Sequence, residues 1–253
     1  MRTLLAALVT SVMTIVLGCI AVLAHTLRID EQGHVVQQWC MRTWAQAICL
    51  AAGVRVEVHG TEHLVPARGT VYPSNHVSWF DVFALASVVP RYTFVAKEEL
   101  RRIPIFGWGA KGAGVIFLSR DNRKSAFEAY QDAAEQVSNG RSVVVFPEGT
   151  RGDSYALRPF KKGPFVLAIA AQAPVVPCVV HGAREVMARG DARVTPGVVH
   201  VHFLAPVPTL TYDYEHRHEL MQVVWDRMAG CLRDVYGVES SEPVIAPGRE
   251  LSA

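Results

Sequence analysis

The sequence has little that would support a cross-linked protein or a nucleic-acid-binding protein. Its five cysteines are odd in number and scattered, and none forms a C-x-x-C pair, so neither a disulfide framework nor a cysteine zinc site is indicated. Lys and Arg total 25 against 23 Asp and Glu, and the net charge of +2 is too small to indicate nucleic-acid binding. Any recognition of an anion must therefore be local.

Charge is absent from a long stretch near the N-terminus. Residues 3–24, TLLAALVTSVMTIVLGCIAVLA, run for 22 residues without a charged side chain. A helix of this length covers a hydrocarbon core of about 30 Å. The alternative, a cleaved signal peptide, usually has an apolar region of only about 7 to 15 residues. We therefore expect an uncleaved membrane anchor, with the signal peptide as the alternative.

A second helix is predicted over residues 35–52, VVQQWCMRTWAQAICLAA. Val36, Cys40 and Trp44 recur at helical spacing, with Gln and Arg between them. Such a helix either lies at the bilayer interface or packs as an ordinary amphipathic core helix, and the sequence favours neither.

After Gly53 the pattern changes to short apolar runs separated by turn residues. Strands are predicted at 54–60, 70–74, 92–97, 114–120, 142–146, 174–180 and 198–204. Helices are predicted at 79–89, 123–140, 162–172 and 215–237.

This alternation predicts an α/β fold with a mixed, largely parallel central sheet flanked by helices, preceded by N-terminal membrane-associated helices. Residues 54–236 contain no repeat, low-complexity tract or linker. We expect an anchor and interfacial helix over 1–52, one domain over 53–237, and a flexible, polar tail over 238–253.

The stretch NHVSWFD, residues 75–81, places a histidine five residues ahead of a carboxylate. On one helix the two side chains would lie roughly 140° apart, so they meet only if the chain bends between them. Ser78 and Asp81 fit a capping box ahead of the apolar run VFALASVV. This reading puts His76 in the turn before the helix, where it can fold back toward Asp81.

Two interpretations of NHVSWFD follow. It is either the polar start of a helix and no more, or a catalytic pair. A carboxylate that holds one imidazole nitrogen sets the tautomer and raises the basicity of the other nitrogen. His76 would then be a general base suited to an alcohol.

The stretch FPEGTRG, residues 146–152, follows a predicted strand directly. Its glycines, Thr150 and Arg151 offer backbone donors, a hydroxyl and a guanidinium, which suit a phosphate. The alternative is a turn with an exposed ion pair between Glu148 and Arg151.

Two further cations stand at the ends of predicted strands. Arg120 ends the run GVIFLSR, and Lys97 ends YTFVAK. Sites gather at strand ends in open α/β sheets, so both are candidates for binding an anion. Both are also compatible with ordinary surface positions.

Two other patterns are set aside. Residues 107–112 satisfy G-x-G-x-x-G but lead into a strand-like run, whereas dinucleotide binding needs a helix there. His200 with His202, and His216 with His218, have no carboxylate or cysteine partner at a recognised metal-motif spacing. We therefore assign no metal.

The sequence has no G-x-S-x-G motif, so nothing indicates a covalent acyl-enzyme intermediate. A lipid hydrolase using Ser78, His76 and Asp81 is the alternative from another reaction class. Ser78 lies only two residues from His76 and is better placed as a helix cap.

Taken together, these motifs resemble the glycerolipid acyltransferase family, which includes the 1-acylglycerol-3-phosphate acyltransferases. NHVSWFD fits that family's N-H-x(4)-D signature and FPEGTRG its phosphate-side signature. GVIFLSR and VPCVV look like its other two blocks, in the same order. The resemblance covers residues 54–181 and the N-terminal helices.

The resemblance implies roles for individual residues. His76 would deprotonate the free glycerol hydroxyl of a lysophospholipid, with Asp81 orienting it, and the alkoxide would attack an acyl thioester directly. Lys97 would lie near the reacting centre and help the developing oxyanion. Binding of the acceptor's phosphate is assigned to Arg120, Glu148, Gly149, Thr150 and Arg151.

The implied activity is acylation of lysophosphatidic acid to phosphatidic acid in phospholipid synthesis. The alternative within the family is another lysolipid, with a different headgroup or a lyso-ornithine lipid. Coenzyme A or acyl carrier protein would supply the acyl group as a substrate, with no permanently bound cofactor. The expected partners are the bilayer, the lysophospholipid and, as one of the two candidate acyl donors, the carrier protein, but no nucleic acid. We expect membrane anchoring, with the catalytic domain on the cytoplasmic face.

Overall fold

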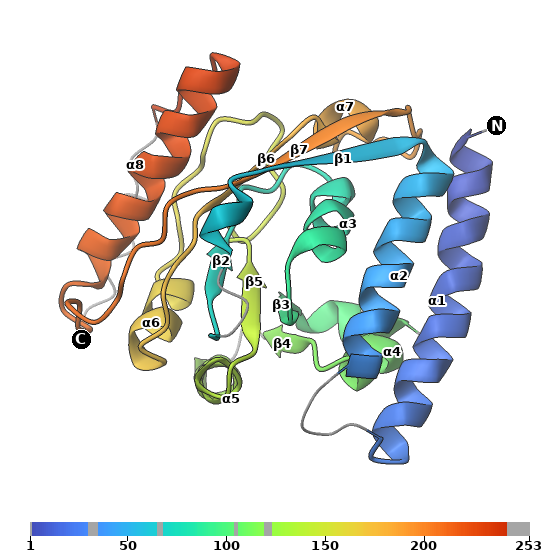
Figure 1. Ribbon diagram of the computed structural model, residues 1–253, viewed down its shortest axis with the longest axis horizontal. Coiled ribbons are helices and arrows are strands. Elements are labelled where there is room, and N and C mark those ends of the chain that lie inside the picture. Colours follow the sequence, from blue (N-terminus) through green and yellow to red (C-terminus); the bar gives the residue numbers. More distant parts are fainter. Residues whose placement is uncertain (1, 30–34, 65–67, 104–105, 119–122, 242–253) are drawn as a thin grey trace.

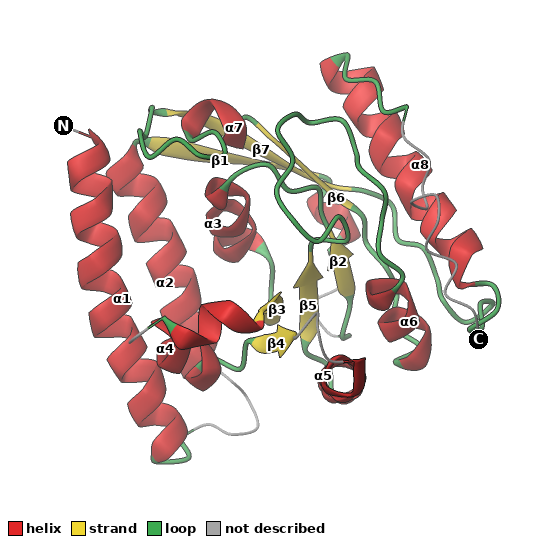
Figure 2. Cartoon of the chain, turned by 180° about the vertical axis from the view of Figure 1, so that it is seen from behind, coloured by secondary structure: helices red, strands yellow, loops and turns green. Residues whose placement is uncertain are grey.

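The computed structural model describes residues 2–29, 35–64, 68–103, 106–118 and 123–241, with only the backbone of 123–128. Two N-terminal helices, α1 (Arg2–Thr26) and α2 (Val35–Ala52), lie side by side along one edge of the molecule (Figures 1 and 2). The strands and the other helices form the rest of the described structure. Figure 2 shows α8 on the side away from this pair.

The described strands form two sheets. One has the order β1-β7-β6, from β1 (Val54–His59), β7 (Gly197–Phe203) and β6 (Cys178–His181). The other has the order β2-β5-β3-β4, from β2 (Val71–Pro73), β5 (Ser142–Val145), β3 (Tyr92–Lys97) and β4 (Ile116–Leu118). The pairing of β6 with β7 is antiparallel, and the others are parallel. Parallel bridges at Ser74 and Val71 connect β2 to the β6 segment, which confirms a mixed, largely parallel arrangement.

The remaining described helices are α3 (Trp79–Val88), α4 (Phe106–Gly112), α5 (Arg123–Ser138), α6 (Gly163–Ala170), α7 (Ala183–Val186), α8 (Arg217–Tyr236) and the short 3-10 helices η1 (Thr61–His63) and η2 (Glu98–Arg102).

Strand β5 shows how helices cover both faces of the sheet. Val144 packs in one cluster with Ile48 of α2 and Phe80 of α3. Val143 packs in the other with residues of α5, α6 and α8. A strand covered on both faces has no polar face, which explains the unbroken run SVVV.

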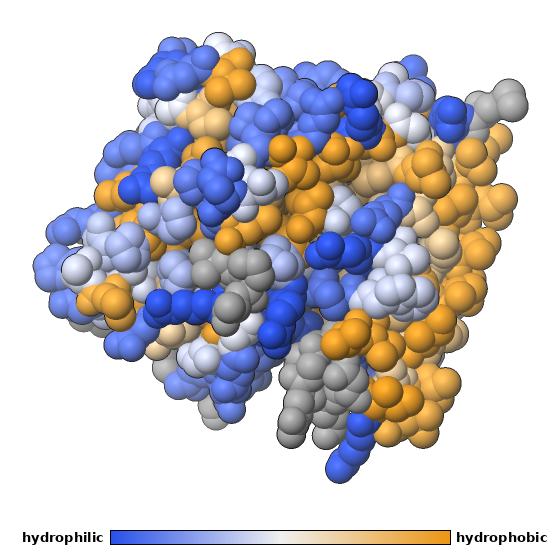
Figure 3. All heavy atoms as spheres, viewed as in Figure 1, coloured by the Kyte–Doolittle hydropathy of each residue, from blue (hydrophilic) through white to orange (hydrophobic). Residues whose placement is uncertain are grey.

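Helix α1 is, among the described residues, the one helix long and apolar enough to cross a membrane. Its apolar side chains gather along one edge of the molecule, at the right of Figure 3. The large exposed ones are Leu4, Leu5, Leu8, Val12, Ile15, Val16, Ile20 and Leu23. A continuous exposed apolar surface of this kind is typical of a membrane contact.

Helix α2 packs between α1 and the α/β body. Cys40 lies against Leu17 of α1, and the Trp44 indole N–H donates to Thr14 Oγ1 over 2.9 Å. On its other side Ile48 is buried with residues of α3. The predicted helix over 35–52 is confirmed, and most of its apolar stripe is used for internal packing.

Two segments differ from the sequence prediction. The strand expected at 174–180 begins only at Cys178, because Pro174 and Pro177 have no N–H to donate and leave only isolated bridges at Val175. The glycine-rich segment at 106–112 forms helix α4.

Close packing explains the glycines of α4. A Cβ on Gly109 would lie 2.9 Å from the Cα of Gly18 in α1, and a Cβ on Gly112 would lie 3.1 Å from the Ala21 carbonyl oxygen. These glycines therefore let the backbone of α4 approach the backbone of α1 closely. Trp108 of the same helix is 68% exposed, as suits an aromatic side chain at a membrane interface.

The chain end is partly described. Helix α8 ends at Tyr236 and is capped by Gly237, whose φ of 66° is left-handed. The Leu157 N–H donates to Ser240 Oγ over 2.9 Å. The chain is thus bound to the domain as far as Ser240. Residues 242–253 of the predicted tail lie outside the described residues.

Candidate active site

The capping box predicted in NHVSWFD is present at the start of α3. Ser78 is the N-cap with extended backbone (φ −141°), and its Oγ accepts from the Phe80 N–H over 3.2 Å. The Asp81 carboxylate accepts from the Ser78 N–H over 2.7 Å. The helix therefore begins one residue after Ser78, and the chain before it is free to turn.

That turn brings His76 to Asp81. His76 Nδ1 lies 2.9 Å from Asp81 Oδ2, which also accepts from the Val77 N–H over 2.6 Å. The Asp81 side chain is fully buried, whereas that of His76 is 14% exposed. The predicted geometry is confirmed: His76 precedes the helix, Asp81 lies in its first turn, and a hydrogen bond joins them. With Nδ1 held by the carboxylate, Nε2 is the nitrogen available to a substrate.

The FPEGTRG loop packs directly against His76. The Phe146 ring stacks on the imidazole with centroids 3.9 Å apart. The His76 N–H donates to Glu148 Oε1 over 3.1 Å, and the Gly152 N–H donates to the His76 carbonyl oxygen over 2.7 Å. The two motifs, more than 70 residues apart in sequence, thus form one rigid unit.

Glu148 is buried behind this loop. Its pKa is raised from 4.5 to about 8. Burial is the largest cause and the charge of Asp81 adds to it, whereas the hydrogen bond from the His76 N–H and the charge of Arg158 oppose it. The exposed ion pair between Glu148 and Arg151, the alternative for this loop, is ruled out by that burial. The side chain orients the His76 backbone from the interior.

Gly149, Thr150 and Arg151 of the same loop line a cavity of about 580 Å³. Gly149 has a φ of 74°, a left-handed conformation that favours glycine, and its N–H donates to the Phe146 carbonyl oxygen over 2.9 Å. The Arg151 guanidinium lies 5.1 Å from the centre of the Trp79 ring, a cation–π contact.

The cavity has a polar part and an apolar part. Its polar wall includes His76, Lys97, Thr150, Arg151, Lys161 and Arg189. Its apolar wall is built largely from the N-terminal helices, α4 and the β3–β4 region, and includes Leu17, Ala21, Met41, Trp44, Phe94, Leu100 and Phe106. A volume of this size is within the range of small-molecule sites, and the division suits an amphipathic ligand.

Two cations, Lys97 and Arg120, were predicted to bind an anion because they stand at strand ends, and the structure describes one of them. Lys97 ends β3, is exposed, and lines the cavity. Arg120 lies outside the described residues.

Sequence reasoning missed Lys161 and Arg189, which also line the cavity. Arg189 donates to the Arg151 carbonyl oxygen over 2.9 Å. Neither stands in a motif or at a predicted strand end, so only tertiary contacts reveal them.

Ser78 is not placed as a nucleophile. Its side chain is buried, and its hydroxyl donates to the Met187 carbonyl oxygen over 2.7 Å while accepting from Phe80. The serine is fully used in capping and tethering α3. This arrangement does not support the hydrolase alternative.

Residues 55–181 match the acyltransferase family. The chain belongs to this family. The matched segment begins in β1, ends in β6, and contains both motifs of the site.

This acyltransferase is similar to named relatives from human and yeast. It is 38% identical over 159 residues to human 1-acyl-sn-glycerol-3-phosphate acyltransferase alpha, covering 62% of this chain and 56% of the relative. It is 32% identical over 222 residues to 1-acyl-sn-glycerol-3-phosphate acyltransferase of Saccharomyces cerevisiae, covering 86% and 72%. The chain thus spans little more than half of the human relative.

The fold of this acyltransferase is similar to a crystal structure over almost the whole chain. The structure is the 1-acyl-sn-glycerophosphate acyltransferase PlsC from Thermotoga maritima, with a TM-score of 0.77 and 26% identity. The match covers 95% of this chain and 97% of that one. The N-terminal helices are therefore part of the shared architecture.

Proposed function

We propose that this acyltransferase transfers a fatty acyl group from an acyl thioester to the free glycerol hydroxyl of lysophosphatidic acid, giving phosphatidic acid. One observation carries the proposal: His76, held by Asp81, lines a cavity whose lining combines cationic side chains with many apolar ones. An anionic lipid that carries one acyl chain has the matching distribution of charge and apolar surface. The names of the relatives agree with this substrate.

His76 acts as the general base in the proposed reaction. Its Nδ1–H donates to Asp81, so Nε2 takes the proton from the acceptor hydroxyl as oxygen attacks the thioester carbonyl. The tetrahedral intermediate collapses by breaking the C–S bond, and the proton on Nε2 passes to the leaving thiolate. Asp81 stabilises the imidazolium between these steps. Lys97 is the proposed donor to the developing oxyanion.

The loop after β5 binds the acceptor's phosphate in this proposal. Thr150 and Arg151 offer it a hydroxyl and a guanidinium from the cavity wall, and Gly149 contributes the left-handed turn that precedes them. Glu148 contributes by holding His76 in position, and Arg120 is the further phosphate ligand implied by the family resemblance. The apolar wall of the cavity takes the acyl chain.

Helix α1 anchors the enzyme in the proposed membrane setting. Its apolar surface is exposed, and the cavity wall includes Leu17 and Ala21 of the same helix. In this proposal a lysophospholipid resident in the bilayer enters the cavity beside α1. The catalytic domain is proposed to face the cytoplasm, where acyl-CoA or acyl carrier protein supplies the acyl group as a substrate.

An acceptor panel tests this function. Purified enzyme in detergent is offered lysophosphatidic acid or lysophospholipids with other headgroups, each with acyl-CoA and with acyl-carrier-protein donors. We expect the highest kcat/KM with lysophosphatidic acid. A higher value with another lysolipid would replace the proposed acceptor with that lipid.

The His76→Ala variant tests the mechanism. We expect loss of transfer while the protein stays folded and membrane-bound. His216→Ala is the matched control, because His216 Nδ1 also pairs with a carboxylate, Asp213, over 2.7 Å, but lies outside the cavity. Full turnover by His76→Ala, or equal losses in both variants, would overturn the assigned base.

A further inference from the structure

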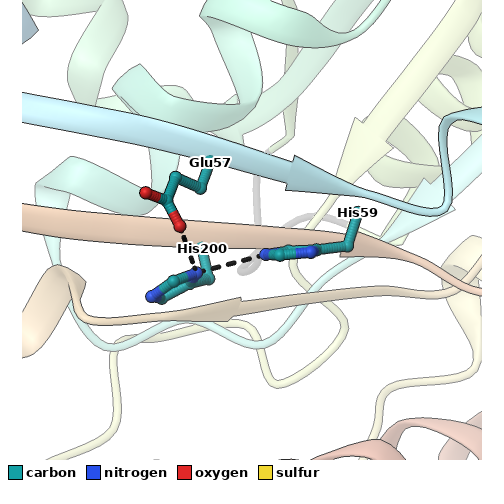
Figure 4. A group of neighbouring side chains, drawn as sticks. All are labelled: Glu57, His59 and His200. Atoms are coloured by element: carbon teal, nitrogen blue, oxygen red, sulfur yellow. Dashed lines mark hydrogen bonds and ion pairs between the residues drawn. The ribbon is translucent and has the colours of Figure 1, made fainter.

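Two histidines and a glutamate meet on the outer face of the β1-β7-β6 sheet. Strands β1 and β7 are parallel, with Glu57 opposite His200 and His59 opposite His202. The alternate residues Val199 and Val201 of β7 are buried in the core on the inner face. Period-two alternation therefore sends Glu57, His59 and His200 outward together, as Figure 4 shows.

Their ligand atoms are close enough to share one ion. His59 Nε2 lies 3.2 Å from His200 Nδ1, and Glu57 Oε2 lies 3.4 Å from the same nitrogen (Figure 4). All three atoms lie within 4.8 Å of one another. Neighbouring ligands around a tetrahedral zinc ion, at bonds of about 2.0–2.1 Å, are separated by roughly 3.3 Å. Two of the three separations already match this value.

Neighbouring groups hold these side chains in place. The other carboxylate oxygen of Glu57, Oε1, pairs with Arg55 over 2.8 Å, which leaves Oε2 directed toward the histidines. The His59 ring stacks on His202 with centroids 4.3 Å apart. His202 Nε2 is in turn bonded to the Tyr236 hydroxyl over 2.6 Å, so His202 supports the site without being a ligand. Such supporting contacts are typical of metal sites, where they orient the ligands.

We propose that Glu57, His59 and His200 bind a divalent zinc ion, with the fourth coordination position open to water. Two imidazoles and one carboxylate form a ligand set suited to zinc, whereas magnesium and calcium prefer oxygen ligands alone. The three residues do not line the cavity that contains His76. The ion is therefore proposed to act apart from acyl transfer, by joining the two strands that carry its ligands.

The position of the site defines that role. Strand β1 begins at Val54, directly after α2 and Gly53, and it pairs with β7 in the β1-β7-β6 order. An ion bound by Glu57 and His59 on β1 and by His200 on β7 would tie the strand that leaves the N-terminal helices to the rest of the sheet. Binding to the folded state alone would then raise its stability.

Zinc titration of the full chain tests the proposal. Chelator-treated protein in detergent micelles is titrated with zinc chloride and, separately, magnesium chloride, and heat and bound metal are measured. We expect one zinc ion per chain, no magnesium uptake, and a zinc-dependent rise in melting temperature. Absence of saturable binding near one zinc per chain would overturn the proposal. The short distance between His59 and His200 would then be explained by the hydrogen bond between them alone.

Variants identify the ligands. We expect His200→Ala and the near-isosteric Glu57→Gln each to raise the zinc Kd by at least roughly tenfold, since supporting residues alone contribute about 10- to 100-fold. His216→Ala is the matched control and should bind as the unmodified protein does, because among the described residues the pair of His216 and Asp213 belongs to no group of three potential metal ligands. Cobalt(II) absorption should show tetrahedral bands that His200→Ala loses. Unchanged zinc affinity and cobalt spectra in both site variants would refute the assignment.

Discussion

The backbone N–H of His76 donates a hydrogen bond to Oε1 of Glu148 over 3.1 Å. Through this contact the phosphate-side loop holds the base on which the proposed chemistry depends. The same carboxylate is buried and has its pKa raised from 4.5 to about 8, with desolvation as the largest cause. A group that positions His76 therefore also makes stability depend on pH.

The Glu148→Gln variant should change how stability depends on pH. Because the folded-state pKa of Glu148 is raised, its contribution is fully present below the unfolded pKa near 4.5 and is lost as pH rises toward 8. The glutamine keeps an oxygen for the His76 N–H but does not titrate. Relative to the unmodified protein, it should gain stability as pH rises, by an amount on the order of a few kcal/mol at most.

Thermal unfolding in detergent from about pH 5 to about pH 9 measures this difference. Parallel pH curves for Glu148→Gln and the unmodified protein would show that the carboxyl group keeps an ordinary pKa.

Arg151→Ala should mainly raise the KM for a phosphate-bearing acceptor. The variant removes a charge-assisted contact in the cavity wall, so kcat/KM should fall roughly ten- to hundredfold. Steady-state kinetics with lysophosphatidic acid measure the loss. Arg193→Ala is the control, because Arg193 is exposed and paired with Asp191 over 3.0 Å. An unchanged KM in Arg151→Ala would mean that the loop recognises a group of the acceptor other than its phosphate.

Ser78→Ala should retain much of the activity and lose stability. The substitution removes the N-cap of α3 and the bond to Met187, and loss of an N-cap typically costs ~1 kcal/mol. Ser87→Ala in the same helix is a control, because its hydroxyl bonds only within α3, to the Ala84 carbonyl oxygen. Denaturant unfolding and transfer assays are compared. Complete inactivation of folded Ser78→Ala would revive the hydrolase interpretation.

Gly109→Ala should destabilise the contact between α4 and α1. Its Cβ would lie 2.9 Å from the Gly18 Cα, and overpacking of this kind costs about 1–3 kcal/mol. Gly230→Ala is the matched control in α8, where the nearest atom to a new Cβ is 4.0 Å away. The control should gain about 0.5–1 kcal/mol from helix propensity. Equal changes in melting temperature would contradict this account of α4.

Local patterns predicted much of the fold. The helix over 35–52 and the strand over 92–97 agree with the structure at both ends. Helix α4 was missed because its glycines disfavour a helix locally, and only their close approach to α1 compensates. The late start of β6 has a local cause, since two prolines interrupt its pairing.

The sequence by itself predicted the relationship between His76 and Asp81, because a capping box spans only a few residues and places His76 in the turn before the helix, within reach of Asp81. Only the tertiary structure decided what surrounds that pair. Glu148 reaches His76 from a loop 72 positions away, and His59 meets His200 across 141 positions. Contacts at such separations depend on which strands become neighbours in a sheet, and that is set by packing of the whole chain rather than by local spacing.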